Sequence, residues 1–405
     1  MRKAIFGSLL LFALTMLIGM VSKPAAFDRF FITQSPIFDA GHYLKIASSG
    51  YVEPPLAAFY PLWPMLLRWL ILPLGFQHTV LIGSLFAFVL FALSLIPFAK
   101  VALRGLPFAA ALCALSLYVL NPNSLFHILL YTESLTALFG SIFLLSTFKI
   151  IEWEREKKKI DFTQIRGTLA TAVLSLFALS LTRPVALPLC ASAAAATGCV
   201  LFFRSSRWQE FIFRNWMRVL REPLVLISLA TVLIAVLAYI PYGLHAQQQY
   251  GSFLAPFDAQ KFWDRKFGLH WDILFKPKSV SSSDNVLFWD LQAFYVPFAL
   301  LLLPFLARMK VLPSAFAQLG TDWLYWLCAF FAAAHAAIAF LTYPIFMSLA
   351  RHVFALPFVF YCIARILALF WNVAWVRRVA WSYAGLSFMF LVYWWSRYAR
   401  EGWIG

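Results

Sequence analysis

The chain has 405 residues, of which 62% are hydrophobic and only 12% are charged. Soluble domains carry about 25% charged residues, so composition excludes a water-soluble fold of this length. The net charge of +16 is compatible with a nucleic-acid partner. However, the basic residues lie in short loops between apolar runs, where membrane topology requires them. We therefore predict an integral membrane protein that does not bind nucleic acid.

Apolar runs of about 20 residues recur along the chain, each long enough to cross about 30 Å of hydrocarbon. A chain in lipid must satisfy its backbone polar groups internally, and continuous apolar runs indicate helices. The sequence predicts an all-α, polytopic transmembrane helical bundle that forms a single domain over 1–405. We expect about 11 spans, near 4–21, 77–99, 107–121, 124–148, 167–182, 185–203, 223–242, 291–309, 322–341, 353–371 and 380–396.

The first predicted span, 4–21, is longer than the h-region of a usual signal peptide, and no clear A-x-A site ends it. We interpret it as an uncleaved span that sets the orientation. The stretch 58–76 is interrupted by prolines and is predicted to be a re-entrant or interfacial segment. The pair 167–182 and 185–203 is short, and one helix kinked at Pro184 is the alternative.

Placing the N-terminus in the cytoplasm puts most basic residues into cytoplasmic loops, as the positive-inside rule requires. Two long loops, 22–76 and 243–290, are then external. Loops with size and polar variety usually carry chemistry, so we expect the working site at the non-cytoplasmic face. This membrane is the plasma or inner membrane if the source is prokaryotic, and the endoplasmic reticulum if it is eukaryotic.

The first external loop contains a candidate catalytic carboxylate, Asp39. A helix over 39–47 places Asp39, His42 and Lys45 on nearly one side, because residues three apart are helical neighbours. A carboxylate that is partly desolvated at a membrane surface is a candidate general base. The alternative is that Asp39 caps the N-terminus of this short helix, and one residue can serve both roles.

Aromatic residues follow in a proline-rich run at 58–64. We predict that Tyr60 and Trp63, together with Tyr43 and Tyr131, line a groove for the acceptor or for a lipid chain. An interfacial aromatic belt is the alternative explanation.

Glu133 lies near the external end of the predicted span 124–148, where an unpaired carboxylate is costly. Such residues mark functional sites by default, and a structural clamp between helices is the alternative. Arg183 interrupts an apolar stretch on the same side. It needs an anionic partner, which Glu133 or a lipid phosphate can supply.

Arg351 and His352 follow the ninth predicted span on that side. Together with Arg183, His42 and Lys45 they are candidates to bind a phosphate or diphosphate, although interfacial snorkelling explains each one singly.

Lipid tolerates ionised side chains only when they have partners. We therefore expect Asp39, Glu133, Arg183 and Arg351 to converge on one cavity near the non-cytoplasmic surface.

The second external loop interleaves charged and aromatic residues. This pattern suits sugar binding, but a solvated amphipathic surface explains most of it. The charged positions are Asp258, Lys261, Asp264, Arg265, Lys266, His270 and Asp272. The cysteines and histidines lack metal-ligand spacing. We predict no metal site and no cofactor, and a requirement for a divalent metal stays open.

Three blocks in the first half of the chain occur in the order found in the PIG-V-type, GPI mannosyltransferase 2-like glycosyltransferases, which the sequence resembles. Members of that family read W-D-A-x-x-[YF]-L-x-I-A-x-x-G-Y followed by F-[FY]-P, then Y-[ST]-E-[AS]-L-F, then T-[GA]-x-R-[SP]. Phe38 stands here where a tryptophan is usual. The matching runs are Phe38-Asp39-Ala40-Gly41-His42-Tyr43-Leu44, Phe59-Tyr60-Pro61, Tyr131-Thr132-Glu133-Ser134-Leu135 and Leu181-Thr182-Arg183-Pro184.

The resemblance implies a GT-C-type fold, with helical external loops and a site at the external or luminal face. It implies inverting transfer of a sugar, most often mannose, from a polyprenyl-phosphate donor to a hydroxyl of a lipid or glycan acceptor. Asp39 would then be the base, and Arg183 and Arg351 would bind the phosphate. The main alternative is a transporter or flippase of a lipid-linked sugar. Glucose, arabinose or aminoarabinose are alternative sugars.

Overall fold

A computed structural model of the chain describes residues 1–21, 38–75, 78–155, 162–204, 222–279 and 284–399. Within these ranges the chain is helical, and the only β-type pairing is an isolated bridge between Ser279 and Phe346. In the described part of the chain, eight helices are long and apolar enough to cross a membrane. The predicted all-α membrane fold is therefore confirmed.

These eight helices match eight of the predicted spans in order. They are α1 (Arg2–Val21), α5 (Thr79–Ala102), α7 (Glu133–Arg155), α8 (Phe162–Thr182), α9 (Ala186–Arg204), α12 (Pro223–Tyr250), α15 (Asp284–Arg308) and α16 (Trp323–Thr342). The other three predicted spans are also helical. Two of them, α6 (Phe108–Val119) and α18 (Pro357–Phe370), are short apolar helices. The third is α19 (Ala374–Ala399), which is rich in tryptophan and arginine. None of the three is among the eight.

Two predicted spans begin too early. The span predicted from residue 124 begins at Glu133, because the preceding segment folds into a short 3-10 helix, η4 (Pro122–His127). The Asn121 side chain caps this turn by accepting a hydrogen bond from the Asn123 N–H, at 2.9 Å. The span predicted from residue 353 begins at Pro357, because a residue before proline disfavours the helical conformation.

The segments flanking Pro184 are two helices rather than one kinked helix. α8 packs against α7, α9 packs against α16, and both contact α12. The predicted non-spanning segment contains α4 (Leu62–Leu74), whose 13 residues extend about 20 Å. That length is too short for about 30 Å of hydrocarbon.

The second external loop is shorter than predicted at both ends, because α12 continues to Tyr250 and α15 begins at Asp284. Between them lie the short helices α13 (Ala255–Asp258), η5 (Ala259–Trp263) and α14 (Asp272–Phe275).

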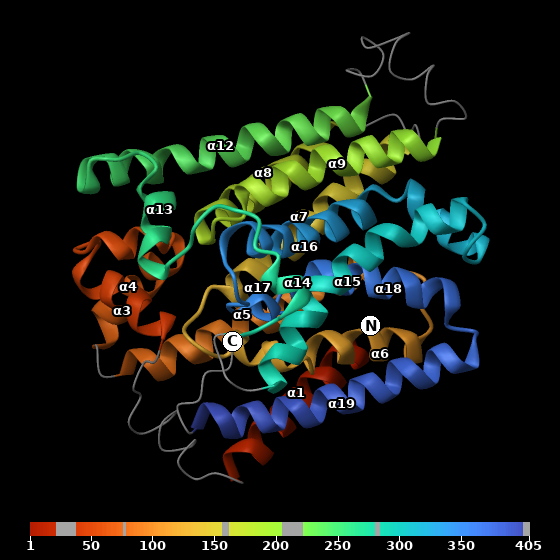
Figure 1. Cartoon of the computed structure of the whole chain (residues 1–405), viewed down its shortest axis with the longest axis horizontal. Coiled ribbons are helices and arrows are strands. Elements are labelled where there is room, and N and C mark those ends of the chain that lie inside the picture. Colours follow the sequence, from red (N-terminus) through yellow and green to blue (C-terminus); the bar gives the residue numbers. More distant parts are fainter. Residues whose placement is uncertain (22–37, 76–77, 156–161, 205–221, 280–283, 400–405) are drawn as a thin grey trace.

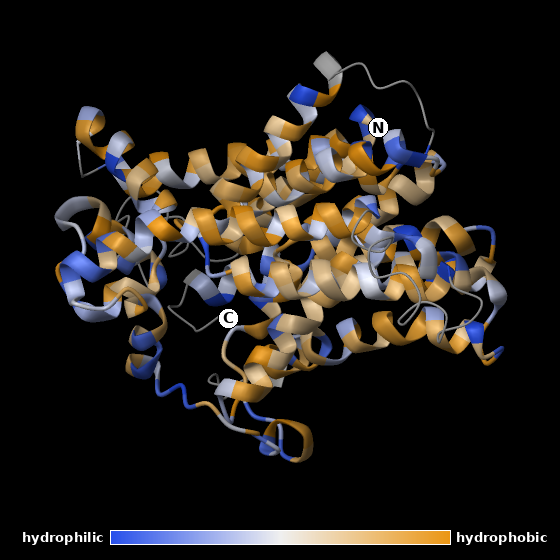
Figure 2. Cartoon of the chain, turned by 90° about the horizontal axis from the view of Figure 1, so that it is seen from above, coloured by the Kyte–Doolittle hydropathy of each residue, from blue (hydrophilic) through white to orange (hydrophobic). Residues whose placement is uncertain are grey.

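The connecting elements gather at two ends of the bundle (Figure 1). α3 (Asp39–Ser49), η2 (Pro54–Ala58), α4 and α13 cover one of them, which we call the α3 end. At the opposite end Arg155 donates to the carbonyl of Thr321, the last residue of η6 (Ser314–Thr321), and Arg308 donates to the Phe202 carbonyl. Hydrophilic residues concentrate toward the ends, and the helices between them are mainly hydrophobic (Figure 2).

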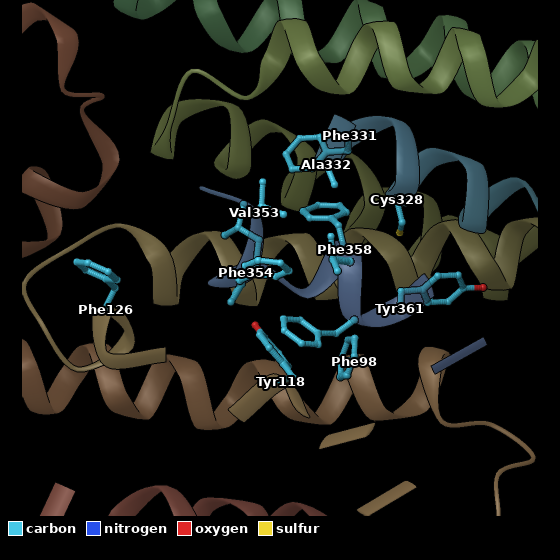
Figure 3. Packing of buried hydrophobic residues seen from close by; sticks show 14 of the residues in the cluster. Phe98, Tyr118, Phe126, Cys328, Phe331, Ala332, Val353, Phe354, Phe358 and Tyr361 are labelled. Atoms are coloured by element: carbon cyan, nitrogen blue, oxygen red, sulfur yellow. The ribbon is translucent and has the colours of Figure 1, made fainter. Parts of the chain in front are cut away.

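Aromatic side chains fix the middle of the bundle, where the short helix α17 (Leu349–Phe354) leads into α18. Phe358 packs on Phe331 of α16 with ring centroids 4.2 Å apart, and Phe360 packs on Tyr118 of α6 at 4.8 Å (Figure 3). Stacked and edge-on aromatic pairs of this kind add directional contacts to dispersion. They hold α17, which carries Arg351 and His352, against its neighbours.

The two ends of α16 are expected to face opposite sides of the membrane. A membrane-impermeant maleimide added to intact cells should label Lys261→Cys in η5, and should label Ser314→Cys in η6 only after permeabilisation. Both positions are exposed, so the difference reports the side rather than burial. Labelling of both from the same side would contradict the alternating arrangement.

Candidate functional site

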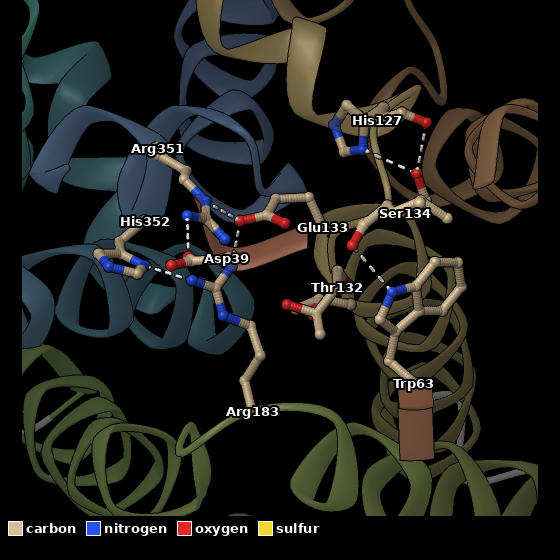
Figure 4. Close-up of polar contacts among 11 residues, drawn as sticks. Asp39, Trp63, His127, Thr132, Glu133, Ser134, Arg183, Arg351 and His352 are labelled. Atoms are coloured by element: carbon tan, nitrogen blue, oxygen red, sulfur yellow. Dashed lines mark hydrogen bonds and ion pairs between the residues drawn. The ribbon is translucent and has the colours of Figure 1, made fainter. Parts of the chain in front are cut away.

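Glu133, at the first turn of α7, is completely buried. Its Oε1 atom accepts a hydrogen bond from Arg183 Nη1 at 2.8 Å and a short one from Arg351 Nε (Figure 4). One carboxylate oxygen therefore joins the α8–α9 junction to α17. A carboxylate in so apolar a place is stable only with such partners.

Arg351 also reaches α3. Its Nη1 donates to Asp39 Oδ2 at 2.6 Å, and its guanidinium lies over the Tyr131 ring at 4.3 Å and the Phe126 ring at 4.9 Å. Burial by itself lowers the pKa of Arg351, but Glu133 and Asp39 more than offset this, and the pKa is raised. The guanidinium is thus a permanent charge, stacked on aromatic faces and held by two carboxylates.

Arg183 follows the last turn of α8. Besides its bond to Glu133, its Nη2 makes a short contact with Nδ1 of His352. Burial, together with the charges of Arg183 and Arg351, holds the pKa of His352 well below its usual value. His352 is therefore neutral near pH 7, and Nδ1 accepts the hydrogen bond from Arg183.

Asp39, Glu133, Arg183, Arg351 and His352 form a connected set, which we call the ion network (Figure 4). They come from α3, α7, the α8–α9 junction and α17. The expectation that the four charged members meet is confirmed. Two arginines balance two carboxylates, as burial of charge requires.

Asp290 of α15 supports this network by holding the start of α17. It is completely buried, its Oδ1 accepts from the Ala350 N–H at 2.8 Å, and its Oδ2 accepts from the Ser279 hydroxyl at 3.2 Å. These bonds secure the first turn of α17, which begins after Ser348 with φ of 57°. The sequence prediction missed Asp290 because it placed the start of that span at residue 291.

A cavity of about 210 Å³ opens beside the ion network. Its lining includes four members of the ion network, Asp39, Arg183, Arg351 and His352. The polar and aromatic side chains that also line it include Tyr43, Tyr60, Trp263, Arg265, His335 and Tyr343. The sequence analysis passed over His335, although a histidine inside a predicted span is an informative signal.

Several predicted site residues lie elsewhere. Lys45 forms an exposed ion pair with Glu53 at 2.5 Å, and His42 packs against Phe59 with the rings tilted and their centroids 4.8 Å apart. Neither lines the cavity. The helical spacing was correct, but only Asp39, at the start of α3, is near enough to Arg351.

Of the four aromatic residues predicted to line a groove, two line the cavity and two do not. Tyr43 and Tyr60 line the cavity, whereas Tyr131 packs under Arg351. Trp63 is fully buried and donates to the Leu130 carbonyl at 3.1 Å, so it ties α4 to the chain before α7 rather than lining a groove.

The alternative role of Asp39 as a helix cap is wrong, because Phe38 occupies the N-cap position. Phe38 has a φ of 55°, which is strained for a bulky side chain. The Asp39 carboxylate turns to Arg351 instead.

Within the described ranges, no three His, Cys, Asp or Glu side chains are grouped as a metal site requires. No family model, no curated protein and no solved structure matches this chain. The site is therefore interpreted from its own chemistry.

Glu133→Gln should destabilise the protein by about 3–5 kcal/mol, because it leaves two arginines without a buried counter-charge. The same change at Glu152, which pairs with Arg104 at a more exposed position, should cost about 0–1 kcal/mol. Thermal unfolding in detergent measures both. Equal losses in the two variants would contradict the importance of Glu133.

Acidification should destabilise the fold partly through His352. Its folded-state pKa is depressed, so as pH falls below about 6.5 the unfolded chain binds a proton that the folded chain does not. Stability should therefore fall from pH 7.5 to 5.5, and His352→Gln should flatten this fall. His245→Gln, at an exposed ring, is the control. Parallel pH profiles for wild type and His352→Gln would contradict a neutral, buried His352.

Proposed function

We propose that this chain is an inverting membrane glycosyltransferase of the GT-C type. It would transfer a sugar from a polyprenyl-phosphate donor to a hydroxyl of a lipid or glycan acceptor at the non-cytoplasmic face. The observation that carries the proposal is that one carboxylate, Asp39, lines a cavity beside two arginines whose positions Glu133 sets.

In the proposed reaction the acceptor hydroxyl attacks the anomeric carbon of the donor. A carbon–oxygen bond forms, the bond from that carbon to the phosphate oxygen breaks, and the hydroxyl proton passes to Asp39. The phosphate leaves with the bonding electrons, and Arg183 and Arg351 stabilise its charge. A single displacement needs one base, unlike the two close carboxylates of a retaining glycosidase.

Because Asp39 is paired with Arg351, the donor phosphate would have to bind before Asp39 can accept a proton. While Arg351 donates to Asp39, that hydrogen bond occupies one oxygen of the carboxylate. A phosphate that enters the cavity competes for the same guanidinium and releases Asp39 toward the acceptor hydroxyl. Catalytic hydrogen bonds commonly rearrange in this way when substrate binds.

The ordered resemblance to PIG-V-type glycosyltransferases supports the same proposal. Its three blocks supply Asp39, Glu133 and Arg183, which are far apart in the sequence and belong to one ion network. Mannose as the sugar, and the plasma or inner membrane or the endoplasmic reticulum as the location, rest on the resemblance and the charge distribution alone.

A flippase or transporter of a lipid-linked sugar is the second candidate. A separate apolar cavity of about 700 Å³ between α15, α18 and α19 favours it, because a lipid chain needs such space during transport. Phe316, Phe370 and Tyr383 are among its lining residues.

The direct experiment incubates the purified protein with a set of polyprenyl-phosphate sugars and an acceptor lipid extract. The proposed enzyme releases polyprenyl phosphate and forms a new glycosidic product. A flippase moves the labelled donor across a vesicle membrane and forms no product.

Asp39→Asn should lower the transfer rate at least about 100-fold, since general base catalysis contributes about 10²–10⁴-fold. The amide keeps the shape and still accepts a hydrogen bond from Arg351, and Asp39 is partly exposed. Folding should therefore be affected much less than by Glu133→Gln. Asp264→Asn is a matched control, because Asp264 is exposed and its φ of 53° suits asparagine. Near-normal transfer by Asp39→Asn would show that Asp39 is not the base.

A further inference from the structure

The chain after η5 is tied to the end of α16. The N–H groups of Lys266, Gly268 and His270 donate to the carbonyls of Thr342, Leu341 and Phe340, at 3.0, 2.9 and 3.1 Å. The last carbonyls of a helix have no partner within it. This segment supplies those partners, and the bonds fix its path beside the cavity that Arg265, Thr342 and Tyr343 line.

Arg265 directly precedes this segment and lines the cavity together with Asp39 and Arg351. Burial lowers the pKa of Arg265, while its interactions with Tyr343 and Asp39 act in the opposite direction. The charge of Arg265 also acts on His352. An arginine stays protonated through such shifts, so Arg265 places a permanent positive charge at the cavity.

The charges of the site are otherwise balanced. Arg183 and Arg351 share the carboxylates of Glu133 and Asp39. In the part of the chain that the structure describes, Arg265 makes no hydrogen bond or ion pair. Its neighbours Asp264 and Lys266 are exposed. The ion network is therefore neutral by itself, and Arg265 adds one positive charge beside it.

We propose that Arg265 is the residue through which the cavity recognises its anionic ligand, a phosphate monoester or diester. Naming that ligand as a lipid phosphate rests on the proposed function. The guanidinium offers a planar fork of donors that matches two phosphate oxygens. A ligand with one negative charge neutralises the cavity, whereas the paired arginines must give up existing partners to bind it.

Arg265 can be replaced without disturbing the ion pairs of the network, so its role in ligand binding can be tested separately from the fold. Glu133 and Arg351 cannot be changed without leaving a buried charge. Arg265 supports no other described side chain, so its removal should alter ligand binding without altering the fold.

The test measures binding of farnesyl phosphate, farnesol and inorganic phosphate to the full chain in detergent by calorimetry. Arg265→Gln should raise the Kd for farnesyl phosphate roughly 10- to 100-fold, which corresponds to loss of a charge-assisted hydrogen-bond pair. Arg265→Lys should fall between, because an ammonium keeps the charge but lacks the fork. Farnesol binding should be unchanged, and so should the melting temperature.

Lys266→Gln is the matched control, since it removes the same charge from the next residue, which faces solvent. An unchanged Kd in Arg265→Gln, an equal loss in Lys266→Gln, or no binding of farnesyl phosphate by the wild type would each overturn the inference. Inorganic phosphate that binds as tightly as farnesyl phosphate, and is lost in Arg265→Gln, would support anion recognition and identify free phosphate as its source.

The two proposals fail separately. Phosphate binding that depends on Arg265, in a protein that transfers no sugar, would contradict the glycosyltransferase and keep the anion site. Sugar transfer by a protein whose phosphate affinity does not depend on Arg265 would contradict this inference alone.

Discussion

One carboxylate oxygen of Glu133 receives hydrogen bonds from two arginines in an interior made largely of aromatic and aliphatic side chains. In such surroundings each charge is costly alone and tolerable only with its partners. The bonds therefore restrict how three parts of the chain can pack: the start of α7, the α8–α9 junction and α17. A fourth part, α3, joins through Asp39.

This constraint explains why the site is rigid before any ligand arrives. Arg351 is held by two carboxylates and two aromatic rings, and Asp290 secures the helix that carries it. Donors that are already oriented need not reorganise when charge develops on a bound group. Asp39 and Arg265 form a face of the cavity, where the ion network meets α3 and the chain after η5.

The sequence predicted the helical membrane fold and the meeting of Asp39, Glu133, Arg183 and Arg351, because ionised groups in apolar runs must find each other. It could not show that Lys45 pairs locally with Glu53, since helical spacing gives a direction and not a distance. It missed Asp290 and His335, because uncertain span boundaries and an otherwise apolar helix concealed them. The break before α7 required the turn chemistry of Asn121, which hydropathy does not measure.

The most direct test is an experimental structure of the protein with a polyprenyl phosphate bound. We expect phosphate density within hydrogen-bonding distance of Arg265 and Arg351, with Glu133 still bonded to both Arg183 and Arg351. Phosphate density at another place on the molecule, or Glu133 and the two arginines separated from one another, would contradict it.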